Sequence, residues 1–135
     1  EDDDIAVSVA KAVKAVDPNR IRGVMPGMET ERAGEKLGLG LAREVYADRG
    51  YQENGNLVQR NQQGAIISDP KKATERVLRM LEDNVIITES GKKISAQLDT
   101  ISVHGDNPSA VKMAMEIRNS IQDNGINLKP FHEFV

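Results

Sequence analysis

The chain has 135 residues, of which 39% are hydrophobic and 3% aromatic, and it carries a formal net charge of −3. This length suffices for one ordinary hydrophobic core, so we expect residues 1–135 to form a single segment that is one domain or part of one. Phosphate backbones bind through excess positive charge and bases stack on aromatic rings. The composition therefore argues against nucleic acid as a partner.

The chain contains no cysteine, which excludes a disulfide framework and a thiol nucleophile. No apolar run reaches the roughly 18 residues that span a bilayer, so we expect no membrane partner. Together these features favour a cytoplasmic protein. The chain starts without an initiator methionine and directly in a helical pattern, so we expect a fragment of a longer protein or a processed product, with an engineered boundary as the alternative.

The first half of the chain alternates helical and extended patterns. Apolar residues at helical spacing from Ile5 to Val16 follow an acidic stretch and predict a helix that Asp17-Pro18 ends. The next predicted elements are a strand over residues 21–25, a helix over 29–37 that Gly38 ends, and a strand over 41–47.

Residues 48–68 are rich in Gly, Asn and Gln and show no sustained periodicity. Long loops inside compact domains are uncommon unless they are functional or disordered. We therefore expect loop 48–68 to lie on the active-site side. Asp69 then supplies an N-cap and Pro70 a first helical position for a helix to about Asp83.

The remaining chain predicts a hairpin, a strand and a helix. A tight turn at residues 89–92 indicates a small surface hairpin. The elements predicted around it and after it are strands over 85–88, 93–98 and 100–103, and a helix to Gly125 that Asn107-Pro108 caps. The tail 129–135, which contains His132, is expected to be peripheral.

Strands that alternate with helices predict parallel βα units covered by helices, so the expected fold class is α/β. Ligands of such folds bind beyond the carboxyl ends of the strands. Two predicted strands are followed there by polar clusters, one beginning at Asp48 and one at His104. These clusters are the candidate sites.

The first cluster is Asp48-Arg49-Gly50-Tyr51. Arg49 is suited to bind a carboxylate through two hydrogen bonds, and Asp48 to accept a hydrogen bond or act as a base. Glu44 lies on the same side of its strand as Asp48 at period two. We take Arg49, Tyr51 and Glu44 as candidate substrate-binding residues. The alternative is a solvated Asp-Arg pair and a paired, structural Glu44.

The second cluster is His104-Gly105-Asp106. His104 has the chemistry of a general acid or base, and Asp106 is placed to orient its ring. The alternative is a histidine that is only hydrogen-bonded at the end of a strand. Arg60, within loop 48–68, offers a second positive charge for an anion or an oxyanion, unless it is merely exposed.

Metal and nucleotide sites have no recognisable motif in this segment. It contains no Gly-rich phosphate loop ending in Lys-Ser, and no paired histidines or cysteines at metal-binding spacing. Neither ATP binding nor metal binding can therefore be derived from these residues.

In order and spacing, several segments together resemble the C-terminal half of the LamB/YcsF family. The segments are Ala12–Pro18, Arg43–Tyr51, Gly55–Val58 with Arg60, Gly64–Ile67 with Asp69-Pro70, Val77–Met80 and Asp99–Asp106. The resemblance runs over nearly the whole chain. It implies part of an irregular (β/α) barrel, related to metal-dependent carbohydrate deacetylases and hydrolases.

The same resemblance implies an activity. Family members look like the A subunit of a 5-oxoprolinase, which acts with B and C subunits and ATP (with Mg²⁺) to open the lactam ring of 5-oxoproline to glutamate. The resemblance does not determine whether the protein binds a metal. Under this interpretation His104, Asp48 and Asp106 are the catalytic candidates, and Arg60 joins the substrate-binding candidates.

The chain also departs from the family pattern. Ser102 stands where the family often has Cys, and Gln63 where Pro is usual. The N-terminal motifs of the family are absent, so we expect this segment to be inactive alone and prone to associate, including with itself. The competing interpretations are a metal-dependent sugar or amide deacetylase and a non-catalytic proteolytic core.

Overall fold

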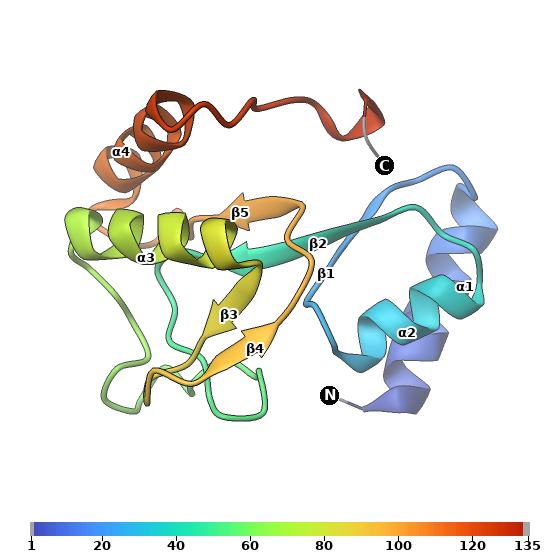
Figure 1. The fold of residues 1–135 in the computed structure, drawn as a ribbon. Coiled ribbons are helices and arrows are strands. Elements are labelled where there is room, and N and C mark those ends of the chain that lie inside the picture. Colours follow the sequence, from blue (N-terminus) through green and yellow to red (C-terminus); the bar gives the residue numbers. More distant parts are fainter. Residues whose placement is uncertain (1, 134–135) are drawn as a thin grey trace.

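The computed structural model describes residues 2–133 and has α/β architecture (Figure 1). In chain order the elements are α1 (Asp3–Val16), β1 (Arg22–Val24), α2 (Glu29–Lys36), β2 (Leu41–Tyr46), α3 (Pro70–Asp83), β3 (Val85–Ile87), β4 (Lys93–Ser95), β5 (Thr100–Ser102), α4 (Ala110–Asp123) and the 3₁₀ turn η1 (Phe131–Glu133). The predicted order of elements is confirmed, although each strand is shorter than expected. Phe134 and Val135, part of the tail predicted to be peripheral, lie outside the described residues.

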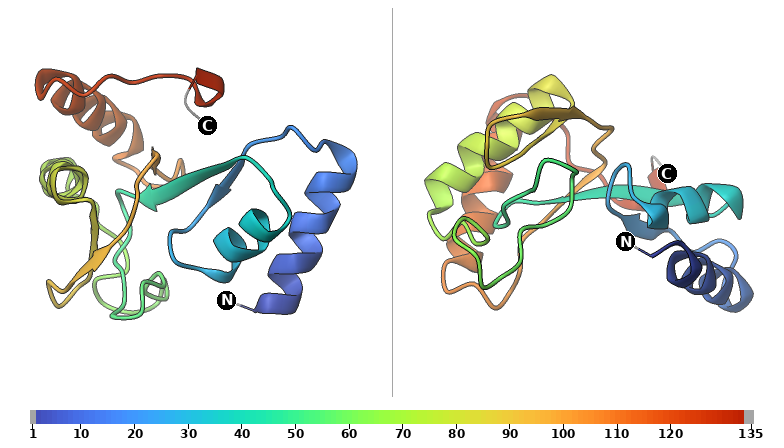
Figure 2. Two further views of the ribbon diagram at one scale, coloured as in Figure 1. Left: turned by 45° about the vertical axis from the view of Figure 1, so that its right-hand side comes forward. Right: turned by 90° about the horizontal axis from the view of Figure 1, so that it is seen from below.

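Strand β2 is the centre of a three-stranded sheet with the order β1-β2-β5, in which both pairs are parallel. Strand β1 pairs with residues 41–43 of β2, and β5 pairs with residues 44–46. The two halves of β2 therefore join two packing units, as both views of Figure 2 show. The prediction of parallel βα units is confirmed.

Each packing unit has its own apolar cluster. Helices α1 and α2 pack on β1 and the start of β2 through Ala10, Val24 and Leu41. Helices α3 and α4 pack on the other end of the sheet, where Met113 and Ala47 are fully buried. Within residues 2–133, no helix is long and apolar enough to cross a membrane.

The β-hairpin is formed by β3 and β4, which pair antiparallel as predicted. Neither β1 nor β5 has a second strand beside it within the described part of the chain. The three parallel strands thus form a piece of sheet, and the barrel implied by the family resemblance is not closed by these residues.

The two later helices begin differently. Helix α3 begins as predicted, because Asp69 Oδ1 accepts the backbone N–H of Lys71 at 3.0 Å and Pro70 follows at the first turn. The predicted cap of α4 is wrong. Asn107 Oδ1 accepts the backbone N–H of Ser109 at 2.9 Å, which makes a turn before the helix. Ser109 is the N-cap residue, and the helix starts at Ala110.

Loop 48–68 is folded tightly although it forms no regular element. Isolated antiparallel bridges join Arg49 to Ile66 and Tyr51 to Leu57. Gly50 lies so close to the opposite side of the loop that a Cβ atom there would sit 2.3 Å from a backbone oxygen. Only glycine permits this approach of two backbones. The loop therefore holds a fixed position beside the end of β2.

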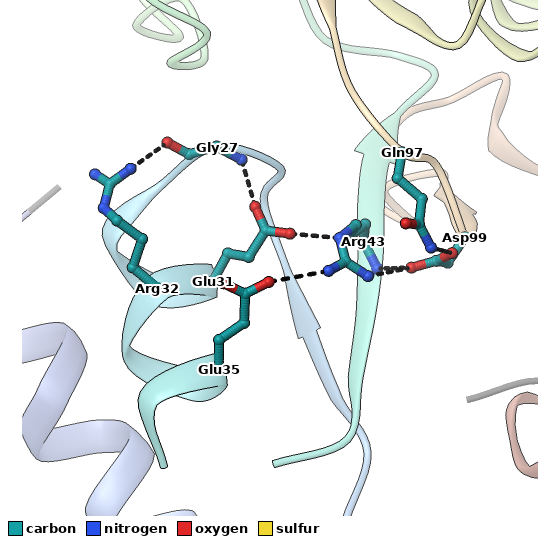
Figure 3. Close-up of polar contacts among 7 residues, drawn as sticks. All are labelled: Gly27, Glu31, Arg32, Glu35, Arg43, Gln97 and Asp99. Carbon is teal, nitrogen blue, oxygen red and sulfur yellow. Dashed lines mark hydrogen bonds and ion pairs between the residues drawn. The ribbon is translucent and has the colours of Figure 1, made fainter. Parts of the chain in front are cut away.

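A partly buried ion network fixes β2 between α2 and the segment before β5 (Figure 3). The Arg43 guanidinium bonds Glu31, lies 3.1 Å from Glu35 and lies 3.4 Å from Asp99. Asp99 also accepts the backbone N–H of Arg43 at 2.9 Å. Burial disfavours the charge on Arg43, but the Glu31 and Asp99 carboxylates more than offset this effect and raise its pKa.

Candidate active site

The tips of β2 and β5 emerge at the same edge of the sheet because the two strands are parallel neighbours. Their pairing continues one residue past β2, where Ala47 N–H donates to Ser102 O at 2.9 Å. The next residues on the two tips are Asp48 and, after Val103, His104. Both polar clusters therefore lie at the same edge of the sheet, where ligands of α/β folds bind.

Asp48 and His104 form a hydrogen-bonded dyad. Nδ1 of His104 lies 2.9 Å from Oδ1 of Asp48, and the backbone N–H of His104 donates to Oδ2 at 3.3 Å. The Asp48 side chain is 2% exposed, whereas that of His104 is 27% exposed. An acceptor at Nδ1 favours the tautomer with the proton on Nδ1, which leaves the Nε2 lone pair available. No residue between 2 and 133 hydrogen-bonds Nε2.

Asp106 does not orient the His104 ring, so that expectation is wrong. Instead, Oδ2 of Asp106 lies 2.8 Å from a guanidinium nitrogen of Arg60. The hydrogen bond and the charge of Arg60 hold the pKa of Asp106 below its ordinary range. The turn that follows His104 directs Asp106 away from the ring, toward loop 48–68.

A cavity of about 180 Å³ opens between loop 48–68 and the turn before α4. Four of the predicted candidates line it, namely Asp48, Arg49, Arg60 and Asp106. Sequence reasoning missed the remaining lining residues, Ile66, Ser68, Asn107 and Pro108. The four charged groups comprise two carboxylates and two guanidinium ions. The cavity is therefore polar and close to neutral, and it reaches the dyad through Asp48, whereas His104 is not among its lining residues.

Arg49 is tied to its own loop. It is 6% exposed, its Nε donates to Ala65 O at 3.0 Å, and a terminal nitrogen donates to Val58 O at 2.7 Å. These two bonds leave only part of the guanidinium at the cavity wall. Arg49 is thus not the open, two-pronged carboxylate partner that we expected.

Tyr51 is fully buried, and its hydroxyl accepts the backbone N–H of Tyr46 at 2.8 Å. Burial raises the pKa of Tyr51 to about 12, so the phenol keeps its proton at neutral pH. The side chain has no surface left for a ligand. The structure therefore assigns Tyr51 to loop anchoring and corrects the expectation that it binds substrate.

Glu44 lies outside the cavity. It stands opposite Thr100 in the sheet, four residues before Asp48, which corresponds to about 13 Å along a strand. A Cβ atom built on Gly23 would lie 3.6 Å from the Glu44 carboxylate, so this carboxylate faces β1. The structure does not bring Glu44 to the cavity that Asp48, Arg49, Arg60 and Asp106 line.

The model of the LamB/YcsF family matches residues 1–135. The chain belongs to this family. It is 44% identical over 131 residues to the A subunit of 5-oxoprolinase from Rhodopseudomonas palustris, an alignment that covers 97% of this chain and 52% of the relative. It is 42% identical over 128 residues to the protein of the same name from Natranaerobius thermophilus, with 95% and 50% covered.

A solved structure agrees with this membership. The lactam utilization protein of Thermus thermophilus superposes with a TM-score of 0.84 and 31% identity, over 96% of this chain and 51% of that protein. The chain therefore spans about half the length of the LamB/YcsF relatives that it matches.

Sequence reasoning also missed two residues of this LamB/YcsF chain that support the dyad. The ring of Tyr46 stacks on that of His104, with the centroids 5.0 Å apart and the planes at 21°. Arg76 donates to the backbone oxygens of Arg49 at 2.9 Å and Ile87 at 2.8 Å, and so joins the loop to the hairpin. Tyr46 lies two residues before Asp48. The alternation of side chains along extended backbone, which places both on the same side, was the one sequence signal that could have pointed to Tyr46.

Proposed function

We propose that this chain is part of the A subunit of an ATP-dependent 5-oxoprolinase, which hydrolyses the lactam of 5-oxoproline to glutamate. Family membership and the names of the relatives support this activity. The observation that carries the proposal is the contact between a buried carboxylate and a partly exposed histidine at the strand tips. A hydrogen-bonded carboxylate–imidazole pair beside a polar cavity has the groups that general acid–base catalysis requires.

The assigned chemistry is proton transfer by His104. Hydrolysis joins a water oxygen to the lactam carbonyl carbon and breaks the bond between that carbon and the ring nitrogen. Nε2 of His104 takes a proton from the water during attack and returns it to the ring nitrogen as it departs. Asp48 holds Nδ1 and stabilises the imidazolium that forms between the two transfers. Such a group contributes roughly 10²- to 10⁴-fold to a rate.

We assign recognition of the substrate carboxylate to Arg60. Its guanidinium lines the cavity, and its only ion-pair partner in the described residues is the exposed Asp106. Solvent screens exposed ion pairs and makes them weak, so a carboxylate can replace Asp106 at low cost. Arg49 contributes positive charge at the cavity wall, while its own donors hold the loop.

ATP, with Mg²⁺, belongs to the proposed reaction because a stable amide needs activation. The cavity beside the dyad does not fit it, because about 180 Å³ is smaller than the roughly 300–1,000 Å³ of ordinary ligand pockets. A larger cavity of about 730 Å³ lies between β5, α4 and the tail and is lined mainly by apolar residues. Residues 2–133 also hold no group of three or more His, Cys, Asp or Glu placed to bind a metal. We therefore propose that the nucleotide does not bind in the cavity beside Asp48, and its site stays a prediction.

The complete assembly is likewise part of the proposal. We propose that the other half of the protein completes a (β/α) barrel beside β1 and β5, and that B and C subunits complete the enzyme. The designation of the relatives as the A subunit supports a multi-subunit enzyme. A cytoplasmic location stays a prediction from the sequence.

The test uses the full-length protein with its partner subunits and ATP, and measures glutamate formation from 5-oxoproline. His104→Ala and Asp48→Ala should each lower turnover by at least about 100-fold while the circular dichroism spectrum is unchanged. His132→Ala, in the exposed tail, is the matched control and should retain full activity. Unchanged turnover in His104→Ala would remove this site from the reaction.

A further inference from the structure

The aromatic ring of Tyr46 covers one face of the His104 imidazole. The ring centroids lie 5.0 Å apart and the planes are inclined by 21°, which is an offset stack. Both rings project from the tips of neighbouring parallel strands, because Tyr46 is the last residue of β2 and His104 follows β5. Tyr46 and Asp48 alternate with the buried Ala47, so both contact His104 from the same side of the sheet.

Tyr46 is itself held in place. Its backbone N–H donates to the hydroxyl of Tyr51 at 2.8 Å, and Tyr51 is fully buried. The guanidinium of Arg76 lies 5.3 Å from the centre of the Tyr51 ring, and Arg76 also binds two backbone oxygens. The backbone that carries the stacking ring is therefore fixed by the fully buried Tyr51 of loop 48–68.

The two neighbours of His104 constrain different motions. The bond from Nδ1 to Asp48 fixes one ring nitrogen, but a single hydrogen bond still permits the ring to tilt about that contact. A flat ring stacked against the imidazole opposes the tilt. Nε2 then points in one direction, which is what transfer to and from a bound substrate requires.

We propose that Tyr46 is a positioning residue that sets the orientation of the His104 ring and so the direction of Nε2. The geometric part of this inference does not depend on the reaction. Its consequence for turnover rests on the proposed function. The proposed role of Tyr46 is exerted through the ring of His104.

The geometric part is tested by the ring-proton resonances of His104 in the histidine-labelled full-length protein, assigned by their loss in His104→Gln. The exposed His132 provides an internal reference. Shielding by the stacked ring should place the His104 resonances upfield of those of His132. Tyr46→Leu should abolish this shift, and Tyr46→Phe should preserve it. A Tyr46→Leu spectrum with the upfield shift intact would overturn the inference.

The kinetic part is tested in the full-length protein with its partner subunits and ATP. Tyr46→Leu should lower kcat by about tenfold with little change in KM, because a misdirected base slows the reaction more than it weakens binding. Tyr46→Phe should restore kcat. If Tyr46→Leu keeps full kcat while His104→Ala is inactive, the positioning role is wrong and the proposed function stands. If His104→Ala is fully active, the proposed function fails, and the kinetic role of Tyr46 fails with it.

Discussion

Asp48 and His104, 56 residues apart in the chain, meet through a contact of 2.9 Å between Oδ1 and Nδ1. Each belongs to the tip of a different strand, and the parallel pairing of β2 with β5 brings the two tips together. The carboxylate is buried and the imidazole is partly exposed, so Asp48 serves as the fixed support while part of the His104 ring is open to solvent.

The first prediction concerns the protonation of His104. With Asp48 as acceptor, the neutral ring should carry its proton on Nδ1, which ¹⁵N chemical shifts of labelled histidine report directly. Asp48→Asn introduces an amide that can donate to Nδ1 and should move the equilibrium toward the Nε2–H tautomer. Asp83→Asn, on the distant helix α3, is the control and should leave the shifts unchanged.

The pair formed by Arg60 and Asp106 gives the second prediction. If Arg60 binds the substrate carboxylate, Arg60→Gln should raise KM by about 10-fold to 100-fold, because a charge-assisted hydrogen bond contributes about 1.5–3 kcal/mol. Arg118→Gln, an exposed change on α4, is the matched control. In the same Arg60→Gln variant, the pKa of Asp106 measured by carbon NMR should rise toward its ordinary value. An unchanged KM would assign carboxylate binding to another residue.

The buried phenol gives the third prediction. The pKa of Tyr51 is about 12 in the folded chain, above its ordinary value of 10.0, so the unfolded chain loses this proton first as pH rises. The free energy of unfolding should therefore be unaffected by Tyr51 below about pH 10 and fall between about pH 10 and 12, by the order of 2–3 kcal/mol. Denaturant titrations of Tyr51→Phe should lack this component. An identical alkaline loss in the variant would show that other groups cause it.

The fourth prediction concerns the network at Arg43. Arg43→Met leaves the carboxylates of Glu31 and Asp99 close together without a cation, so the free energy of unfolding should fall by about 2–3 kcal/mol. The exposed pair of Lys93 with Asp83 provides the comparison, because Lys93→Met should cost less than about 1 kcal/mol. Equal losses in the two variants would mean that the network adds nothing beyond a surface ion pair.

Much of the arrangement was predictable because it depends on local patterns. The alternation of strands and helices predicts parallel neighbours, and parallel neighbours place Asp48 and His104 at one edge. Asp69 with Pro70 predicts the start of α3 for an equally local reason. These inferences need no knowledge of distant contacts.

The partner of His104 was not predictable in the same way. Asp106, two residues from His104, is the carboxylate that proximity in the sequence favours, but the backbone turn between them directs it to Arg60. The contacts of Arg43 and the burial of Tyr51 likewise depend on residues far away in the sequence. A single sequence reports which residues carry charge or aromatic rings, but the fold decides which of them meet.

The most direct test of the Asp48–His104 dyad is a double-mutant cycle in the full-length, assembled enzyme, with kcat for glutamate formation as the measured quantity. If the two residues act as one unit, the double variant Asp48→Ala/His104→Ala should be no slower than His104→Ala alone. Fully multiplicative losses, or a His104→Ala enzyme with unchanged turnover, would contradict the account.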